Sequence, residues 1–497
     1  MHDIATWAKD ASSDSPNVYW LFGPAGSGKS TIAFTIAHQF GSPDTNANTV
    51  TLGADFFCSR QFDETKELKR IVRTIAYRLS LVCAPFAHAL SRSSKFDAID
   101  HDCKSQIKEL LVKPWQASDR DRAADLPSPP SYLVIIDALD EIDDGGGSEF
   151  LRTLFDVLNK GELQGLKFFA TSRPHHGLVS EVNSFETKRL YRLQDVDREE
   201  VTDDIRIHLS SGLPHFAKRQ EIGILAGEAD GLFIYAATVV RYLEKYKPPE
   251  QERLLARFLD SGSSSMPKRC KDDATSLDTL YSQILFSTFD ELDEEIQGSR
   301  LRSLYALLCT VERTSTSLVA ELLSASGDDD ISVAIVDAVL EELHAVLYTE
   351  KDQVLSYHKS FSDFLFHEGR SKNYWCDQVA QHRSLAKDCF LVMKAKLKFN
   401  IANIPSSFIL DRDDQTLSTR VEDNIPAVLR YACRNWHRHL CFSATTASDG
   451  FRGDLVEFIQ LRAVFWIEAM NLLGSVGQCE EMFREASKWV GSVSHTS

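Results

Sequence analysis

The chain has 497 residues, of which 43% are hydrophobic and 26% are charged. This balance is typical of globular proteins and excludes a disordered, collagen-like or disulfide-scaffold chain, and the length allows about three domains. The 55 Lys and Arg residues against 72 Asp and Glu residues give a net charge of −17, which argues against a general nucleic-acid coat or a protein that binds anionic membranes.

The ten cysteines include no CxxC pair, so we expect reduced thiols and not a disulfide framework. No apolar run reaches the roughly 18 residues that a membrane-spanning helix needs, and the N-terminus lacks the basic start and apolar core of a signal peptide. The sequence therefore predicts a cytoplasmic protein whose partners include neither a membrane nor nucleic acid.

Short apolar runs alternate with helical patterns in roughly the first 200 residues. A short polar helix is predicted within residues 1–20, and a polar, proline-rich surface loop is predicted at residues 114–131. Strands are predicted at residues 18–22, 52–57, 132–136, 166–171 and 188–193, with continuous apolar runs typical of buried strands at 18–22, 132–136 and 166–171. Amphipathic helices are predicted at 31–40 and 68–82. This alternation predicts an α/β domain with a doubly wound parallel sheet.

Helical periodicity replaces the strand pattern after about residue 195. Helices are predicted at residues 201–209, 219–229, 232–246, 276–289, 300–311, 315–324 and 333–346, with a linker at 260–273. A hairpin at residues 347–357 after these helices predicts a winged-helix-like module, and the C-terminal region is mostly helical. We therefore expect an N-terminal helix or linker (1–20), a nucleotide-binding domain (21–198), a helical domain (199–262), a winged-helix-like domain (263–371) and a C-terminal helical region (372–497).

Residues 23–30 read GPAGSGKS and match the pattern GxxxxGK[ST] between a predicted strand and a predicted helix, which is the context that identifies a phosphate-binding loop. Glycines let the backbone turn so that successive N–H groups point at the phosphates, and the following helix adds its unpaired N–H groups. We expect Lys29 to contact the β- and γ-phosphates and Ser30 to bind Mg²⁺. The predicted nucleotide-binding residues are Gly23, Pro24, Ala25, Gly26, Ser27, Gly28, Lys29, Ser30 and Thr31.

Acidic side chains follow the apolar strand at residues 132–136. Asp137 comes directly after this strand, at the carboxyl edge where a doubly wound sheet binds its ligand, and we expect it to hold Mg²⁺ together with Ser30. Asp140 and Glu141 are the candidate catalytic residues, since either carboxylate could orient and deprotonate an attacking water. A carboxylate cluster that caps a helix is the alternative.

Arg173 follows the strand at residues 166–171. Its guanidinium would reach the same sheet edge as Asp137, where it could contact a γ-phosphate and report its presence. A surface arginine that caps the strand is the alternative. Arg60 could also reach the phosphates, but a surface role is the interpretation we favour.

The segments GPAGSGKST, LVIIDALDE and FATSRP, in this order and spacing, resemble the NACHT branch of the STAND class of P-loop NTPases. The similarity is strongest to fungal NOD-like receptors, whose nucleotide domain is described as nephrocystin-3-like. The small residue Ala138 after Asp137, with Asp140 and Glu141 beyond it, is the feature that points to NACHT. The resemblance implies a P-loop NTPase that binds ATP or GTP with Mg²⁺ and hydrolyses it slowly.

The resemblance extends to two later segments. Residues 230–237 resemble a helical-domain segment in which many members place a proline against the adenine, and Phe233 occupies the comparable place here. Residues 357–365 resemble the end of the family's winged helix, which implies that His358 senses the β-phosphate of bound ADP. Lys359 stands where many relatives carry Asp.

By this resemblance the protein is a nucleotide-operated signalling switch. ADP would hold a closed monomer through Lys29 and His358, and ATP with Mg²⁺ would favour an open form that self-associates into a homo-oligomer. Family members usually carry an N-terminal effector and a C-terminal repeat sensor, and we expect this chain to be a receptor core that is truncated or works with effector or sensor proteins in trans. A turnover NTPase or kinase and a degenerate nucleotide-binding scaffold are the alternatives. The sequence does not distinguish ATP from GTP, because no NKxD-type guanine motif is evident.

Cys433, His437 and Cys441 recur at every fourth residue and could form a metal-binding face. Zinc sites more often use CxxC or HxxxH pairs closed by a turn. The same segment also fits a simple packed helix, which is the interpretation we favour.

Overall fold

The fold is described from a computed structural model. It describes the whole chain apart from residues 13, 42–49, 93–100, 124–130, 143–144, 186–187, 194–197, 261–274, 291, 327–330, 407, 409, 444–448 and 494–497. The chain forms two compact units, Met1–Ala237 and Thr238–Ser497, and each is described by itself. The predicted linker at residues 260–273 lies almost entirely outside the described residues.

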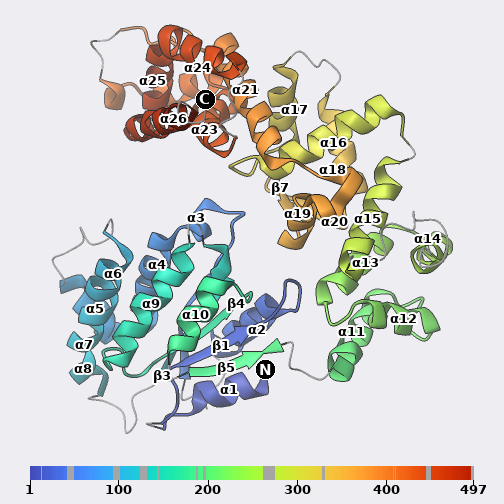
Figure 1. The fold of residues 1–497 in the computed structure, drawn as a ribbon. Helices are drawn as coiled ribbons and strands as arrows, with labels where there is room; N and C mark the ends of the chain where they lie inside the picture. The colour runs from blue at the N-terminus through green and yellow to red at the C-terminus, as the bar shows by residue number, and fades with distance from the viewer. Residues whose placement is uncertain are drawn as a thin grey trace. The chain divides into compact units, whose positions relative to one another are not determined.

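A five-stranded parallel sheet forms the centre of the first unit (Figure 1). Its strands are β1 (Val18–Phe22), β2 (Val50–Phe57), β3 (Ser131–Asp137), β4 (Leu166–Ser172) and β5 (Lys188–Arg192), in the spatial order β2-β3-β4-β1-β5. All five predicted strands are confirmed. Strands β1, β3 and β4 are almost entirely buried, and their apolar runs are the pattern that a sheet buried on both faces requires, whereas the edge strand β5 is partly exposed. The predicted doubly wound α/β fold is likewise confirmed.

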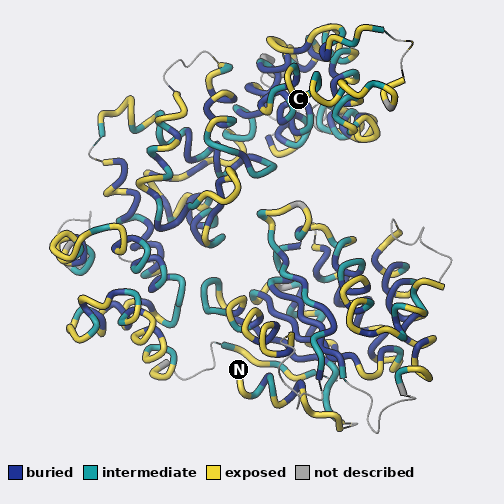
Figure 2. The backbone as a smooth tube through the Cα atoms, turned by 180° about the vertical axis from the view of Figure 1, so that it is seen from behind, coloured by how far each residue is buried: buried dark blue, intermediate teal, exposed yellow. Residues whose placement is uncertain are grey.

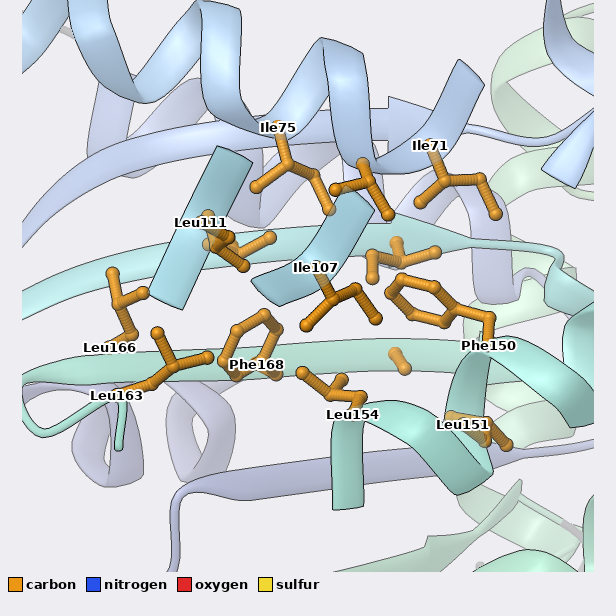
Figure 3. Packing of buried hydrophobic residues seen from close by; sticks show 14 of the residues in the cluster. Ile71, Ile75, Ile107, Leu111, Phe150, Leu151, Leu154, Leu163, Leu166 and Phe168 are labelled. Atoms are coloured by element: carbon orange, nitrogen blue, oxygen red, sulfur yellow. The ribbon is translucent and has the colours of Figure 1, made fainter. Parts of the chain in front are cut away.

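The two faces of this sheet carry separate hydrophobic cores, because successive strand residues point to opposite sides. Trp20 and Phe168 belong to one core, and Tyr19 and Phe169 belong to the other. Figure 3 shows side chains of α4, a π-helix and α9 gathered over Phe168. Strands β1, β3 and β4 run through the buried interior of the unit (Figure 2).

Helices cover both faces of the sheet. The second core is covered by α1 (His2–Lys9) and α2 (Lys29–Gly41). The first core is covered by α4 (Leu68–Val82), α5 (Ala84–Arg92), α6 (Cys103–Gln106), the π-helix Ile107–Val112, α7 (Lys113–Ala117), α9 (Gly146–Asn159) and α10 (His176–Ser184). Two short helices, α3 (Asp63–Lys66) and α8 (Asp119–Ala123), complete this part.

The predicted surface loop at residues 114–131 is wrong over its first half, where α7 and α8 form. Trp115 is only 2% exposed, and its indole N–H donates to the carbonyl oxygen of Gln164 at 2.9 Å. Pro114 is compatible with this helix because the first helical turn needs no N–H from that residue. The burial of one tryptophan therefore overrides the polar, proline-rich composition of its neighbours.

The N-terminal helix is attached to the sheet by a buried lysine near the start of β4. Lys167 is 5% exposed, and its Nζ donates to the carbonyl oxygens of Trp7 (2.6 Å) and Asp10 (2.5 Å) and to Ser15 Oγ (2.9 Å). Burial lowers the pKa of Lys167. A cation is favourable at this position because the last carbonyls of a helix lack intrahelical partners and carry a partial negative charge.

The first unit ends with three helices that match the predicted ones closely. These are α11 (Arg198–Gly212), α12 (Gln220–Glu228) and α13 (Phe233–Glu244). The boundary between the two units falls within α13.

Among its described residues, the second unit is mainly helical and contains one hairpin. Strands β6 (Leu347–Glu350) and β7 (Gln353–Ser356) pair antiparallel, and Lys351 and Asp352 between them both have positive φ, as a two-residue hairpin turn requires. The predicted hairpin is therefore confirmed. The helices before it are α14 (Pro248–Asp260), α15 (Ser276–Phe289), α16 (Glu294–Cys309), α17 (Thr316–Ser324) and α18 (Val333–Glu342), and α19 (Lys359–Leu365) and α20 (Glu368–Ser371) follow it.

The C-terminal part of this unit is helical, as predicted. Its helices are α21 (Gln378–Lys396), α22 (Leu417–Asn424), α23 (Ala427–Phe442), α24 (Asp449–Leu461), α25 (Ala463–Leu472) and α26 (Cys479–Val493). Trp436 and Trp466 are fully buried in their shared core. Among the described residues, no helix has both the length and the apolar character needed to cross a bilayer.

The segment with Cys433, His437 and Cys441 forms the packed helix α23. Cys433 is buried in the hydrophobic core and Cys441 is exposed, so the two thiols face different surroundings. Within the described part of the chain, no group of three or more His, Cys, Asp or Glu side chains could hold a metal ion. All cysteines in that part are free thiols.

Candidate functional site

The phosphate-binding loop connects β1 to α2, as the motif predicts. Gly26 and Gly28 adopt φ values of 77° and 86°, a left-handed conformation that glycine adopts at little cost. Helix α2 begins at Lys29, so the unpaired N–H groups of its first turn lie at the end of the loop. The arrangement supplies backbone donors and the positive end of a helix dipole to an anion.

Lys29 is buried against its own loop, with 8% of its surface exposed. Its Nζ donates to the carbonyl oxygens of Gly23 at 2.8 Å and Pro24 at 2.7 Å. Burial lowers the pKa of Lys29 to about 8, against the opposing charges of Asp140, Asp137 and Glu141. The site therefore holds an ammonium group that is largely removed from water and that three carboxylates stabilise electrostatically, while Arg173 acts in the opposite direction.

Asp137 ends β3 at the carboxyl edge of the sheet and is 3% exposed. Burial raises its pKa, while hydrogen bonds from Ser30 and Thr171 and the charge of Lys29 act in the opposite direction. The structure thus brings Ser30 and Asp137 together, as the sequence predicts. A carboxylate beside a hydroxyl is a set of hard oxygen donors of the kind that Mg²⁺ prefers, so these residues fit the implied ion.

Thr171 belongs to this site although the sequence analysis gives it no role. Its hydroxyl donates to Asp137 Oδ1 at 2.5 Å and accepts the backbone N–H of Ala138 at 3.0 Å. Ala138 has φ 53° and ψ 46°, a left-handed conformation that is unfavourable for a residue with a Cβ. Thr171 therefore orients the carboxylate and stabilises the turn that follows it. A polar residue at the end of a fully buried strand is the signal that could have identified it.

The two candidate catalytic carboxylates lie in a short 3₁₀ turn after β3, Leu139–Glu141. Arg173 binds Asp140 twice: its backbone N–H donates to Oδ1 at 2.9 Å, and its Nε lies 3.4 Å from Oδ2. The Nη2 atom of Arg173 also lies 3.9 Å from Glu141 Oε1. Arg173 thus reaches the predicted sheet edge, where its partners are the acidic residues.

Arg60, after β2, contacts the same acidic turn. Its backbone N–H donates to Glu141 Oε2 at 3.2 Å, and its Nη2 donates to the carbonyl oxygen of Asp140 at 3.3 Å. Arg60 is exposed, as predicted. Its position beside Glu141 depends on β2 and β3 being neighbours in the sheet, which the local sequence does not reveal.

The start of α13 contacts the phosphate-binding loop. The backbone N–H of Ile234 donates to the carbonyl oxygen of Gly26 at 3.2 Å. A Cβ atom on Gly26 would lie 2.1 Å from Ile234 Cγ2, so no larger residue fits there without a shift. A Cβ atom on Gly28 would lie 3.7 Å from a ring carbon of Phe233, which places this ring beside the loop.

His358 lies in the second unit, whereas the other predicted site residues lie in the first. It immediately precedes α19, and its Nδ1 accepts the backbone N–H of Ser360 at 3.1 Å. The ring therefore has a defined orientation at the start of a helix.

A parallel sheet with a GxxxxGKS loop after β1 and an aspartate at the end of β3 defines the P-loop NTPase fold. Residues 2–173 match the family model described as nephrocystin 3, N-terminal. This part of the chain is therefore a nephrocystin-3-like P-loop NTPase domain.

Comparison with solved structures finds distant similarities, among them the following three. A Walker-type ATPase of Pyrococcus abyssi is 13% identical with a TM-score of 0.33, covering 73% of this chain and 94% of its own. The Aeropyrum pernix ORC1 protein in complex with DNA is 12% identical with a TM-score of 0.32, covering 79% and 92%. Drosophila ORC bound to DNA is 14% identical with a TM-score of 0.29, covering 69% and 79%. No curated protein matches the sequence.

Proposed function

We propose that the protein is a nucleotide-operated signal-transduction switch of the NACHT type, within the STAND class that includes the NOD-like receptors. The observation that carries this proposal is the convergence of Lys29, Asp137, Asp140, Glu141 and Arg173 on one edge of the sheet. This set contains a phosphate-binding cation, a magnesium-binding carboxylate, a candidate base and a residue able to respond to a γ-phosphate.

Each residue has a role in the proposed binding of ATP or GTP. The loop N–H groups and Lys29 bind the β- and γ-phosphates, and Ser30 and Asp137 hold Mg²⁺, which neutralises phosphate charge. Glu141, or Asp140 beside it, orients and deprotonates the attacking water. Arg173 is paired with both carboxylates, so a γ-phosphate would compete with them for the guanidinium.

This competition supports a switch with slow hydrolysis more than an enzyme with fast turnover. While Arg173 is paired with Glu141, part of the negative charge that would attract a proton from water is neutralised. Moving a two-state equilibrium from 1:99 to 99:1 requires a difference of about 5.5 kcal/mol between the two ligands. A γ-phosphate with its charge-assisted bonds to Arg173 is a source of several of those kcal/mol.

The proposed switch uses both units of the chain. ADP is read by Lys29 in the nucleotide-binding domain (21–198) and by His358 in the winged-helix-like domain (263–371), with the helical domain (199–262) between them. The ATP form self-associates and signals to effector or sensor proteins in trans, in the cytoplasm.

The test is the nucleotide content and particle size of the purified chain. Mass spectrometry of the co-purifying nucleotide distinguishes ATP from GTP, and light scattering measures self-association. We expect Lys29→Met to lose nucleotide, and Glu141→Gln to retain the triphosphate and form larger particles. Glu480→Gln is the matched control, because that carboxylate is exposed on α26 and forms its salt bridge with Arg484, one turn away.

Three outcomes would contradict the switch. Unchanged nucleotide content and size in both variants would remove the proposed roles of Lys29 and Glu141. A steady-state rate near the enzyme median of about 10 s⁻¹ would indicate a turnover NTPase or kinase. An affinity no tighter than about 1 mM would indicate a degenerate scaffold.

A further inference from the structure

Three side chains in the second unit form a continuous hydrogen-bonded chain that ends on His358. The hydroxyl of Tyr281 on α15 lies 2.7 Å from Ser360 Oγ, and Ser360 Oγ lies 2.7 Å from His358 Nδ1. Tyr281 and Ser360 are buried, and His358 is half-buried. These hydrogen bonds therefore connect the core of the unit to the imidazole ring of His358, directly before α19.

The direction of each hydrogen bond follows from one group that can only donate. The backbone N–H of Ser360 points at His358 Nδ1 at 3.1 Å, so Nδ1 accepts and carries no proton. The Ser360 hydroxyl must then donate to Nδ1, and the Tyr281 hydroxyl must donate to Ser360 Oγ. Burial raises the pKa of Tyr281 to about 12, which keeps this phenol protonated as a donor.

A neutral imidazole without a proton on Nδ1 carries it on Nε2. In this tautomer Nε2 is a donor only. In the opposite tautomer Nε2 would present a lone pair, which an anionic oxygen repels. The tautomer of His358 therefore decides whether the ring attracts or rejects a phosphate.

Packing between helices fixes the hydrogen-bonded chain in place. The ring of Tyr281 contacts Phe361 and Phe364 of α19, with centroids 5.3 Å and 5.6 Å apart. Asp278, one turn before Tyr281, forms a bidentate salt bridge with Arg370 of α20. The carbonyl oxygen of His358 accepts the Ser356 hydroxyl at 3.0 Å, so the backbone is also held.

We propose that Ser360 and Tyr281 are positioning residues that hold His358 as the Nε2–H tautomer, so that it donates a hydrogen bond to a phosphate oxygen of the bound nucleoside diphosphate. This inference rests on the proposed function, in which His358 reads the β-phosphate. It adds the reason why the sensor is a neutral donor: a proton on Nδ1 would oppose the two donors that already point at that atom.

The test compares ADP and ATP affinities in Ser360→Ala and Tyr281→Phe. We expect ADP to bind about tenfold more weakly in Ser360→Ala and about threefold more weakly in Tyr281→Phe, with ATP affinity changed less than twofold. Ser371→Ala and Tyr374→Phe are the matched controls, because they remove buried hydroxyls that bond elsewhere in the unit. Tyr281→Phe keeps the aromatic ring and thus tests the proposal even if Ser360→Ala fails to fold.

Two further measurements separate positioning from a purely structural role. In a His358→Gln background, which offers an amide donor but no Nδ1, Ser360→Ala and Tyr281→Phe should have no further effect on ADP affinity. The ¹⁵N spectrum of the ring, assigned by its loss in His358→Gln, should show an unprotonated Nδ1. The proposal would be overturned if Ser360→Ala and Tyr281→Phe weakened ADP binding as much in the His358→Gln background as in the original protein. A protonated Nδ1 would overturn it as well.

The failure of this proposal is distinct from the failure of the proposed function. If His358→Ala leaves ADP affinity unchanged, the reading of the β-phosphate by His358 is wrong, and the positioning role falls with it. If His358→Ala weakens ADP binding but Ser360→Ala and Tyr281→Phe do not, His358 remains the sensor and only the positioning role is overturned.

Discussion

Two buried lysines at opposite ends of the same sheet have different partners. Lys29 at the carboxyl end binds two carbonyls of its own loop, five and six residues away. Lys167 near the amino end binds three oxygen atoms of the N-terminal segment, more than 150 residues away. The pKa of each is lowered by burial.

The sequence distance between a buried lysine and its partners indicates whether the lysine has a structural or a ligand-binding role. The partners of Lys167 hold two distant segments together, so exchanging them would detach α1 from the sheet. The partners of Lys29 belong to its own loop, and three carboxylates interact with it electrostatically. Phosphate oxygens can therefore replace its carbonyl partners without separating any helix or strand from the sheet. The comparison predicts that affinity depends on Lys29 and stability on Lys167.

The largest expected effect is that of Lys29→Met on nucleotide binding. Charge-assisted hydrogen bonds to phosphate contribute about 3 kcal/mol, so affinity should fall by about 100-fold. Thermal stability should stay the same or rise, because a buried charge is removed. Titration with a fluorescent nucleotide and a thermal melt measure the two quantities. A stability loss as large as the affinity loss would contradict the distinction.

Lys167→Met should show the reverse pattern. Three oxygen atoms lose their donor, and at about 1 to 3 kcal/mol for each buried unsatisfied group we expect a stability loss of roughly 3 kcal/mol in urea unfolding. Nucleotide affinity of the folded protein should change less than twofold. Lys113→Met is the control, because Lys113 is half-exposed and its salt bridge is with Glu109, four residues earlier in the preceding π-helix, and it should cost less than about 1 kcal/mol.

The pH dependence of binding sharpens the same comparison. The pKa of Lys29 is lowered to about 8, and phosphates favour its charged form. Affinity should therefore be nearly constant below about pH 7, fall about twofold by pH 8 and fall about tenfold by pH 9. For stability the sign is opposite: the buried charge costs stability below pH 8, and this cost disappears as pH rises toward about 10.4. Titrations at pH 7, 8 and 9 measure the affinity, and Lys29→Met should lack this dependence.

The smallest effect concerns the turn at the carboxyl end. Ala138 has a left-handed backbone, so Ala138→Gly should raise stability by about 0.5 kcal/mol, the relief of strain exceeding the entropy cost of glycine. Urea unfolding measures this change. A loss above about 1 kcal/mol would show that the methyl group, and not the Thr171 hydrogen bond alone, stabilises the turn.

The sequence predicts the parts of this fold that depend on local pattern. Short strand patterns between helical patterns identify the five strands, and the GxxxxGKS motif identifies a loop whose glycines adopt the required left-handed backbone. The same local evidence fails at Trp115, because the burial of this side chain depends on a carbonyl at residue 164. Composition alone therefore assigns α7 to a loop.

Only those site residues that a local pattern marks could be predicted from the sequence. Lys29, Asp137 and Arg173 follow from strand ends and a motif, whereas Thr171 and Arg60 act on residues 33 to 81 positions away in the sequence. Their roles arise from the order of strands in the sheet. The position of His358 relative to Lys29 and the boundaries of the five expected domains stay predictions.

The contact between Ile234 and Gly26 has a consequence for the amide that follows in the loop. The carbonyl and N–H of one trans peptide unit point in opposite directions, and the carbonyl of Gly26 is directed at the start of α13. The N–H of Ser27 is therefore directed away from that helix. A flip of the Gly26–Ser27 peptide would exchange the directions of this N–H donor and this carbonyl acceptor in the phosphate-binding loop. Such a flip would first have to break the hydrogen bond to α13. The hydrogen bond from α13 therefore keeps the N–H of Ser27 in its orientation as a donor in the loop.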